Sequence, residues 1–178
     1  SDVYKRQLQG LYELAYKTVM LPRSVVLASI QASMPAFSYQ TKADPEASRG
    51  LYRRILRRTA QVTAAVGAAI CLGAPVASWL WLGHVDLRYW AFTVILTLGI
   101  LTALVNAPGA SIGFVTGHLR HNIWIAVATL AFTFALGFLM GRIFGPYGTV
   151  TAISVGTGLG SMILRRLNER LLYQENRV

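Results

Sequence analysis

The chain has 178 residues, of which 54% are apolar and only 13% are charged, and 17 Lys and Arg against 7 Asp and Glu give it a net charge of +10. An ordinary soluble domain carries roughly a quarter of charged residues, so this composition excludes one. The basic residues lie at the edges of apolar runs, a pattern that is typical of membrane proteins and that argues against a nucleic-acid-binding protein.

The first predicted span covers residues 8–39 and is largely apolar, but it contains Glu13, Lys17 and Arg23. Glu13 and Lys17 are four residues apart, so on a helix they share a face and can form an ion pair. Pro22 lies in the middle of the segment and should kink or split the helix. Because a charge in lipid is costly, this helix must turn its polar face toward protein or water.

Four further stretches lack Asp, Glu, Lys and Arg over roughly the 20 residues that a helix needs to cross about 30 Å of hydrocarbon. They do not alternate between apolar and polar residues, which argues against membrane strands. The predicted spans are residues 59–82, 89–117, 122–141 and 147–164, followed by a tail of residues 165–178. With the first span they predict an all-α, polytopic transmembrane helical bundle of about five spans.

Basic residues are many in one link between predicted spans and few in the next. The segment 39–58 and the tail are rich in Lys and Arg, the link 117–121 has Arg120 between two histidines, and the other two links hold one Arg each. The positive-inside rule therefore places the segment 39–58, the link 117–121 and the C-terminus in the cytoplasm.

Four arginines precede the second span at helical spacing: Arg53, Arg54, Arg57 and Arg58. They predict a short interfacial helix that leads into the span. They set the topology, or they form a site for a substrate or for anionic lipid headgroups, to which each would contribute about 1 kcal/mol.

The same topology starts residue 8 outside the cell. An odd number of spans with an outside start leads us to expect a preceding helix, so that the chain is a fragment. Residues 1–7 are charged and fit nothing that follows, and we expect them to be a scar or a non-native start.

The third span is interrupted at residues 106–109, which are Asn-Ala-Pro-Gly. Asn and Pro at membrane depth free backbone groups, which neighbouring helices or water in a cavity must satisfy. Such a break lines a binding cavity, as in many transporters, or it is a structural kink. Glycine pairs at four-residue spacing predict close packing of helices within the bundle. They are Gly109/Gly113/Gly117, Gly137/Gly141 and Gly156/Gly160.

The sequence offers no catalytic or metal-binding constellation. It has no Gly-x-Ser-x-Gly motif, no cluster of metal ligands and no pair of carboxylates within a span, so we expect neither an enzyme nor a cofactor. Cys71 lies in an apolar run, as a small packed residue does. Glu13 is the one acidic residue at membrane depth, and it either pairs with Lys17 or acts as a protonatable, cation-coupled carboxylate.

The first span carries a pattern that resembles a known family. It is Gly-Leu-Tyr-Glu-Leu-Ala-Tyr-Lys over residues 10–17, Leu-Pro at 21–22 and Met-Pro-Ala-Phe-Ser over 34–38. This is similar to the pattern of bacterial lipid-linked oligosaccharide flippases, the polysaccharide transporter branch of the multidrug/oligosaccharidyl-lipid/polysaccharide exporter superfamily. Three later features also resemble that family: the basic run 52–58, the break at Asn106 and Phe-Gly-Pro-Tyr-Gly-Thr over 144–149.

The resemblance implies a bacterial inner-membrane protein of two pseudo-symmetric halves with both termini in the cytoplasm. The chain would match the last five spans, in the C-terminal half of such a two-lobed transporter, and its expected partner is the missing N-terminal half. The implied activity is flipping of an undecaprenyl-pyrophosphate-linked oligosaccharide to the outer leaflet by ion-driven alternating access. This step serves the synthesis of lipopolysaccharide O-antigen or exopolysaccharide.

A pyrophosphate headgroup needs cations in a wet cavity, and sugars need hydrogen-bonding or stacking partners, while the apolar tails stay among membrane lipids. The polar side chains of the spans that suit such a ligand are Lys17, Arg23, Tyr12, Tyr16 and Asn106. Glu13 is the candidate for ion coupling.

Three other functions stay open. A drug or organic-cation exporter of the related extrusion branch would favour acids in its cavity, so the sign of the cavity charge separates it from a flippase. A non-transporting component of an envelope assembly is a second alternative. A membrane enzyme would need acidic or histidine residues clustered at one interface, whereas His118 and His121 suit contacts with headgroups.

Overall fold

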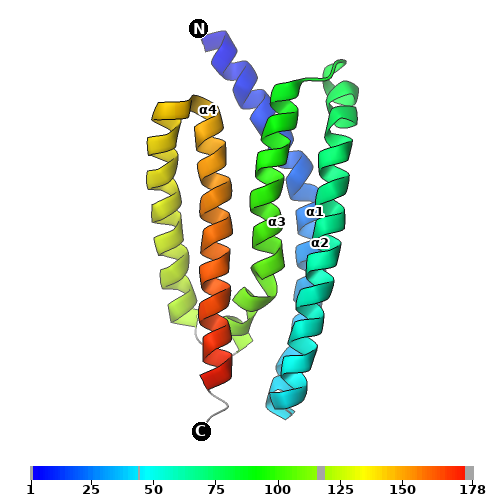
Figure 1. Cartoon of the computed structure of the whole chain (residues 1–178), viewed down its shortest axis with the longest axis vertical. Coiled ribbons are helices and arrows are strands. Elements are labelled where there is room, and N and C mark those ends of the chain that lie inside the picture. Colours follow the sequence, from blue (N-terminus) through cyan, green and yellow to red (C-terminus); the bar gives the residue numbers. More distant parts are fainter. Residues whose placement is uncertain (1, 44, 116–118, 175–178) are drawn as a thin grey trace.

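The computed structural model describes residues 2–43, 45–115 and 119–174, and it describes side chains for residues 6–36, 39, 50–111 and 120–170. In this part the chain is all-α, as predicted, and its helices are α1 (Asp2–Ala43), α2 (Pro45–Leu82), α3 (Leu87–Val115) and α4 (Leu119–Gln174) (Figure 1). Three segments are long and apolar enough to cross a membrane: Gly50–Leu82, Leu87–Ser111 and Arg120–Arg170. The fold is therefore compatible with a helical membrane bundle. Some predicted features lie outside the described side chains, among them Lys42, Arg49, Gly113, Gly117 and His118.

α4 folds back on itself at Gly145 and forms two antiparallel arms, residues 119–144 and 146–174 (Figure 1). Gly145 has φ 61° and ψ −145°, a conformation that a residue with a Cβ rarely adopts. Pro146 starts the second arm with a φ that already suits a helix. Because of this reversal, four helices give five helical passes.

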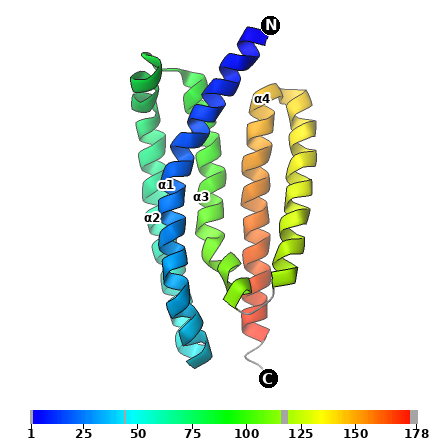
Figure 2. The same cartoon turned by 180° about the vertical axis from the view of Figure 1, so that it is seen from behind.

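α1 is a helix of 42 residues that continues through Pro22 and Pro35. The helix is therefore not split at Pro22, which was one of the two outcomes that the sequence allowed. α1 is not among the segments apolar enough to cross a membrane, because it carries the charges of Glu13, Lys17 and Arg23. It runs obliquely across one side of the bundle, from the second arm of α4 at its N-terminus toward α2 (Figure 2).

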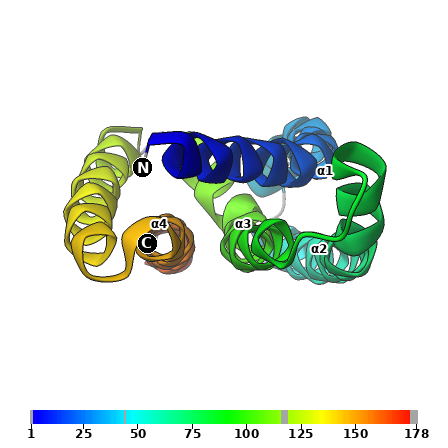
Figure 3. The ribbon, with the colours of Figure 1, turned by 90° about the horizontal axis from the view of Figure 1, so that it is seen from above.

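The helices lie in the order first arm of α4, second arm of α4, α3, α2, with α1 alongside (Figures 1 and 3). α3 is central, because it contacts α1, α2 and α4. The start of α2 and the ends of α3 and α4 lie at one end of the bundle, which we call the C-terminal end. The α2–α3 turn and Gly145 lie at the opposite end, which we call the turn end.

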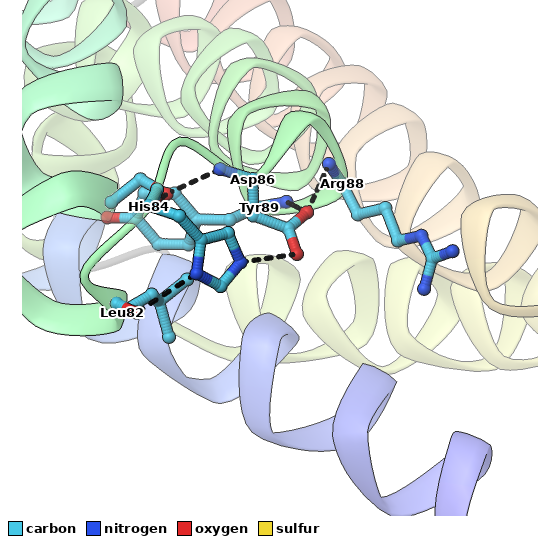
Figure 4. Close-up of polar contacts among 6 residues, drawn as sticks. Leu82, His84, Asp86, Arg88 and Tyr89 are labelled. Atoms are coloured by element: carbon cyan, nitrogen blue, oxygen red, sulfur yellow. Dashed lines mark hydrogen bonds and ion pairs between the residues drawn. The ribbon is translucent and has the colours of Figure 1, made fainter.

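Side-chain hydrogen bonds hold the α2–α3 turn in place (Figure 4). The Oδ1 atom of Asp86 accepts from the backbone N–H groups of Arg88 at 2.7 Å and Tyr89 at 3.4 Å, so Asp86 caps the N-terminus of α3. Ser78 Oγ accepts from the Asp86 N–H at 2.9 Å and donates to the His84 carbonyl at 3.1 Å. Polar side chains of Ser78 and Asp86 thus fix the backbone of the turn end.

The core lies where α3 meets α1. Tyr89, Phe92 and Leu96 of α3 are at most 2% exposed, and they form one cluster with Val19 of α1. The hydroxyl groups of Tyr89 and Thr18 are 2.9 Å apart, so a hydrogen bond joins the two helices within this cluster. Inside lipid, such packing and hydrogen bonds, rather than a hydrophobic effect, hold helices together.

The glycines of α4 have two different environments. A Cβ added at Gly156 would overlap Thr133, and one added at Gly160 would overlap Thr129, both on the opposite arm. These two glycines therefore let the arms approach closely, as their spacing predicts. Gly137 differs, because nothing lies within 4 Å of a Cβ added there.

We expect Gly156→Ala to lower the free energy of unfolding by about 1–3 kcal/mol, because the added methyl overpacks the contact with Thr133. Gly137→Ala is the matched control, and there the gain in helix propensity should stabilise the protein by roughly 0.5–1 kcal/mol. Thermal unfolding of the two purified variants in detergent measures the difference. Equal losses in both variants would contradict the close approach at Gly156.

Candidate functional site

Glu13 and Lys17, two of the three charged residues of the first predicted span, form an ion pair on the outside of α1. Lys17 Nζ lies 3.3 Å from Glu13 Oε1, and the two side chains are 67% and 64% exposed. The opposite face of α1 carries the buried residues Ala15, Val19 and Val26. The pair therefore points away from the rest of the bundle.

This pair belongs to a longer polar face of α1, which we call the α1 polar stripe. Its exposed members are Gln9, Glu13, Lys17, Ser24 and Gln31. Between Gln9 and Gln31 the helix rises by about 33 Å at about 1.5 Å per residue, which equals a bilayer's hydrocarbon thickness of roughly 30 Å. The charged half of this face, around Glu13 and Lys17, is not suited to contact with lipid tails, whereas Ser24 turns its hydroxyl to the Leu21 carbonyl at 2.7 Å.

Tyr12 and Tyr16 lie at the turn end of α1 and contact other aromatic rings. The centroids of their rings are 6.1 Å apart, and Tyr12 also meets the edge of Phe92 of α3 at 6.4 Å. Phe92 in turn stacks at 4.8 Å on Tyr147, next to the α4 reversal. The rings thus connect α1, α3 and α4.

A cavity of about 310 Å³ adjoins these rings. It is lined by Gln9 and Tyr12 of α1, Phe92 of α3 and Pro146 and Thr149 of α4, among others. Leu8, Val150 and Ile153 complete the lining, so the cavity is mostly apolar and suits an apolar or aromatic group with few polar atoms.

Arg23 lies farther along α1 than Lys17 and does not share its direction. Six residues separate them, which corresponds to about 9 Å of rise and about a third of a turn. The Arg23 guanidinium is 3.9 Å from Met20 Sδ. By the same periodicity Arg23 shares a face with Tyr12 and Tyr16, so the cation and the two tyrosines border the α1 polar stripe on one side.

Asn106 is not near the other predicted site residues. It follows Phe92 on α3 by 14 residues, or about 21 Å of helix, and it is 5% exposed. Its amide Nδ2 donates to the Thr102 carbonyl at 2.6 Å, and its Oδ1 accepts from Arg165 Nη1 at 3.3 Å. The structure therefore brings Asn106 to the C-terminal end and to α4, not to the α1 polar stripe.

Arg165 and Glu169 form a polar cluster with Tyr52 at the C-terminal end. Arg165 Nε donates to Glu169 Oε1 at 2.8 Å, and the side chains are only 27% and 23% exposed. The Tyr52 hydroxyl of α2 donates to the same Oε1 atom at 2.6 Å. With Asn106, this cluster, which we call the Glu169 network, joins α2, α3 and α4. A Cβ added at Gly109 of α3 would overlap the Arg165 stem, so that glycine makes room for it.

The helix α3 continues through residues 106–109 with Pro108 inside it, so the predicted interruption is not a break in the helix, and side chains of α4 bind the backbone there. Asn168 Nδ2 donates to the Gly109 carbonyl at 3.1 Å, and Asn122 Nδ2 donates to the Ala110 carbonyl at 3.3 Å. Asn168 is fully buried and Asn122 is 6% exposed. Side chains of the neighbouring helix α4 thus bind the backbone of α3 just after Pro108.

No group of three or more His, Cys, Asp or Glu side chains that could hold a metal ion occurs in the described part of the chain. Comparison with protein-family models, with curated proteins and with solved structures gave no match. The candidate site therefore rests on the chain's own geometry: the α1 polar stripe, with the tyrosines and Arg23 beside it.

Proposed function

We propose that this chain is part of a membrane transporter that flips a lipid-linked oligosaccharide by alternating access. The observation that carries the proposal is the α1 polar stripe, which stays exposed over about the thickness of a bilayer while the neighbouring helices are apolar. Such a face is stable beside water or protein, not beside lipid tails. The N-terminal half of a two-lobed transporter would lie opposite α1, and the translocation path would run between the lobes.

The side chains of the α1 polar stripe and of the residues beside it suit an undecaprenyl-pyrophosphate-linked sugar. Lys17 and Arg23 offer positive charge to the pyrophosphate, and Tyr12 and Tyr16 offer rings and hydroxyls to the sugar. Glu13 is within 3.3 Å of Lys17, so its protonation or its binding of a cation would release Lys17 for the anion. This exchange would couple an ion gradient to transport.

The proposed location is the bacterial inner membrane, with the C-terminal end of the bundle in the cytoplasm. The support is the distribution of charge between the two ends. Arg53, Arg54, Arg57 and Arg58 lie at the start of α2, at the C-terminal end, whereas the α2–α3 turn holds Arg88 beside Asp86. The positive-inside rule gives the orientation.

In cells that depend on this transporter, we expect Lys17→Ala and Arg23→Ala each to lower export of surface polysaccharide about tenfold, because each removes a charged contact of roughly 1.5 kcal/mol. Cell-surface polysaccharide is measured at equal levels of membrane-inserted protein. Lys17→Arg keeps the charge and serves as the control, with export close to that of the unchanged chain.

Export at the original level by both alanine variants would remove the proposal. A rise in sensitivity to cationic drugs with Glu13→Gln, without any loss of polysaccharide, would instead assign the chain to the drug-extrusion branch. A flippase would depend on the positive charges of Lys17 and Arg23, whereas a drug exporter would depend on the negative charge of Glu13.

A further inference from the structure

A second cavity, separate from the α1 polar stripe, lies between α1 and α2 and has a volume of about 700 Å³. On α1 its lining extends from Pro22 to Ser33, and on α2 it extends from Ile55 to Val66. It is open to the outside of the bundle, since Val25 and Val62 on its two walls are 67% and 51% exposed. We call it the α1–α2 groove.

The walls of the groove suit hydrocarbon. Most of the lining is Val, Ile and Pro, and the serines turn their hydroxyls to their own helix. Ser29 Oγ donates to the Val25 carbonyl at 3.0 Å, and Ser33 Oγ donates to the Ile30 carbonyl at 2.7 Å. A polar ligand would therefore find few free donors along the walls, whereas an acyl chain would find continuous apolar contact.

The length of the groove equals that of one membrane leaflet. From Ile55 to Val66 the helix rises by about 16 Å, which is roughly half of the 30 Å hydrocarbon core. Ile55 lies one helical turn before residue 59, where the predicted second span begins, so the groove starts at the expected membrane surface and extends toward the bilayer centre. A chain from one leaflet can fill it.

The polar end of the groove is positively charged. Arg58 lines it, and Arg54 lies one helical turn before Arg58 on the same face of α2. Both side chains are exposed. Within the described part of the chain no ion pair or hydrogen bond engages Arg58, whereas Lys17 and Arg165 are paired with acids. A cation at the surface end of an apolar groove of leaflet length is complementary to a lipid phosphate.

We propose that the α1–α2 groove binds an anionic phospholipid of the surrounding bilayer, with one acyl chain between α1 and α2 and the phosphate on Arg58 and Arg54. The site is independent of the proposed transport function, because it uses neither the α1 polar stripe nor the aromatic rings. The bound lipid fills the space that α1 and α2 leave between them.

The test is lipid binding to the purified full chain in neutral detergent, measured by native mass spectrometry with phosphatidylglycerol and with phosphatidylcholine of the same acyl chains. We expect phosphatidylglycerol to bind more tightly. Arg58→Gln should weaken it about fivefold, as loss of one basic residue near a phosphate does, and should weaken phosphatidylcholine less, because the choline cation offsets the charge of its phosphate. Arg53→Gln is the matched control, because Arg53 lies five residues from Arg58 and points more than a third of a turn away.

Filling the groove tests the acyl chain. Ser29→Phe on one wall should weaken both lipids, and Val62→Phe on the other wall is the second variant if the first does not fold. Equal effects of Arg53→Gln and Arg58→Gln would overturn the proposal in favour of diffuse surface charge. Unchanged binding after groove filling, or equal binding of glycerol phosphate without acyl chains, would also overturn it. A shift from dimer to monomer on groove filling would assign the groove to a second copy instead.

Discussion

Glu169→Ala should lower the free energy of unfolding by about 2–3 kcal/mol, less than removal of one partner of a fully buried ion pair, because the pair is partly exposed. Glu169 Oε1 accepts both from Arg165 Nε at 2.8 Å and from the Tyr52 hydroxyl at 2.6 Å. The substitution leaves the Arg165 guanidinium, 27% exposed, without its counter-charge next to α3. Unfolding in detergent with increasing denaturant measures the loss.

Three further variants separate charge from packing in the Glu169 network. Combining Arg165→Met with Glu169→Leu should recover most of the stability, because an apolar pair of similar volume often replaces a buried ion pair without loss. Tyr52→Phe removes one hydrogen bond to a charged group and should cost about 1.5–3 kcal/mol. Arg166→Ala, on the exposed neighbour, should have little effect. A double variant as unstable as Glu169→Ala alone would show that the charge is not the cause.

The Glu169 network and the turn end hold the bundle by different means. At the C-terminal end, polar side chains of α4 bind Tyr52 of α2 and the backbone of α3 near Gly109. At the turn end, the capped turn at Asp86 and the ring of Phe92 connect α3 with its neighbours. α3 is thus fixed at both ends, while α1 has one face exposed along its length.

The helices could be predicted from the sequence because lipid restricts secondary structure strongly: a stretch without charges that is long enough to cross hydrocarbon is a helix. Local backbone geometry was not predicted, because α3 continues through Pro108 and the reversal between the last two spans depends on a positive φ at Gly145. The ion pair of Glu13 and Lys17 was predicted from their four-residue spacing, whereas the contact of Tyr12 with Tyr16, at the same spacing, was not predicted.

The predicted site was only partly assembled, because long-range contacts are not visible in local spacing. Arg165 and Glu169 have the same four-residue spacing as Glu13 and Lys17, but they were assigned to a tail after the last span. Their partner Tyr52 is 117 residues away in sequence. Asn106, which looked like a cavity residue, faces Arg165 instead of the tyrosines. In both cases the missing information was which helices are neighbours.

Phe92→Ala should destabilise the protein by about 3–5 kcal/mol, as truncation of a fully buried phenylalanine does. Phe92 has no exposed surface and touches Tyr12 of α1 and Tyr147 of α4, so its loss enlarges the cavity of about 310 Å³ beside them. Tyr12 then keeps only its contact with Tyr16 of the same helix, Tyr147 loses the ring on which it stacks, and the contact between α1, α3 and the reversal of α4 loosens. Thermal unfolding in detergent and the near-UV signal of the tyrosines measure both effects.

Phe134→Ala is the matched control, because Phe134 is 78% exposed on the first arm of α4 and should cost little. Phe92→Leu keeps most of the volume but loses the edge contact with Tyr12, and we expect it to cost about 1–1.5 kcal/mol. This order, with alanine worst, leucine intermediate and the exposed control neutral, is expected if the volume of the Phe92 ring fills the space between α1 and α4. If Phe92→Leu were as harmful as Phe92→Ala, the shape of the ring rather than its volume would hold Tyr12 in place. If Phe92→Ala were as mild as Phe134→Ala, α1 would not be anchored at this ring.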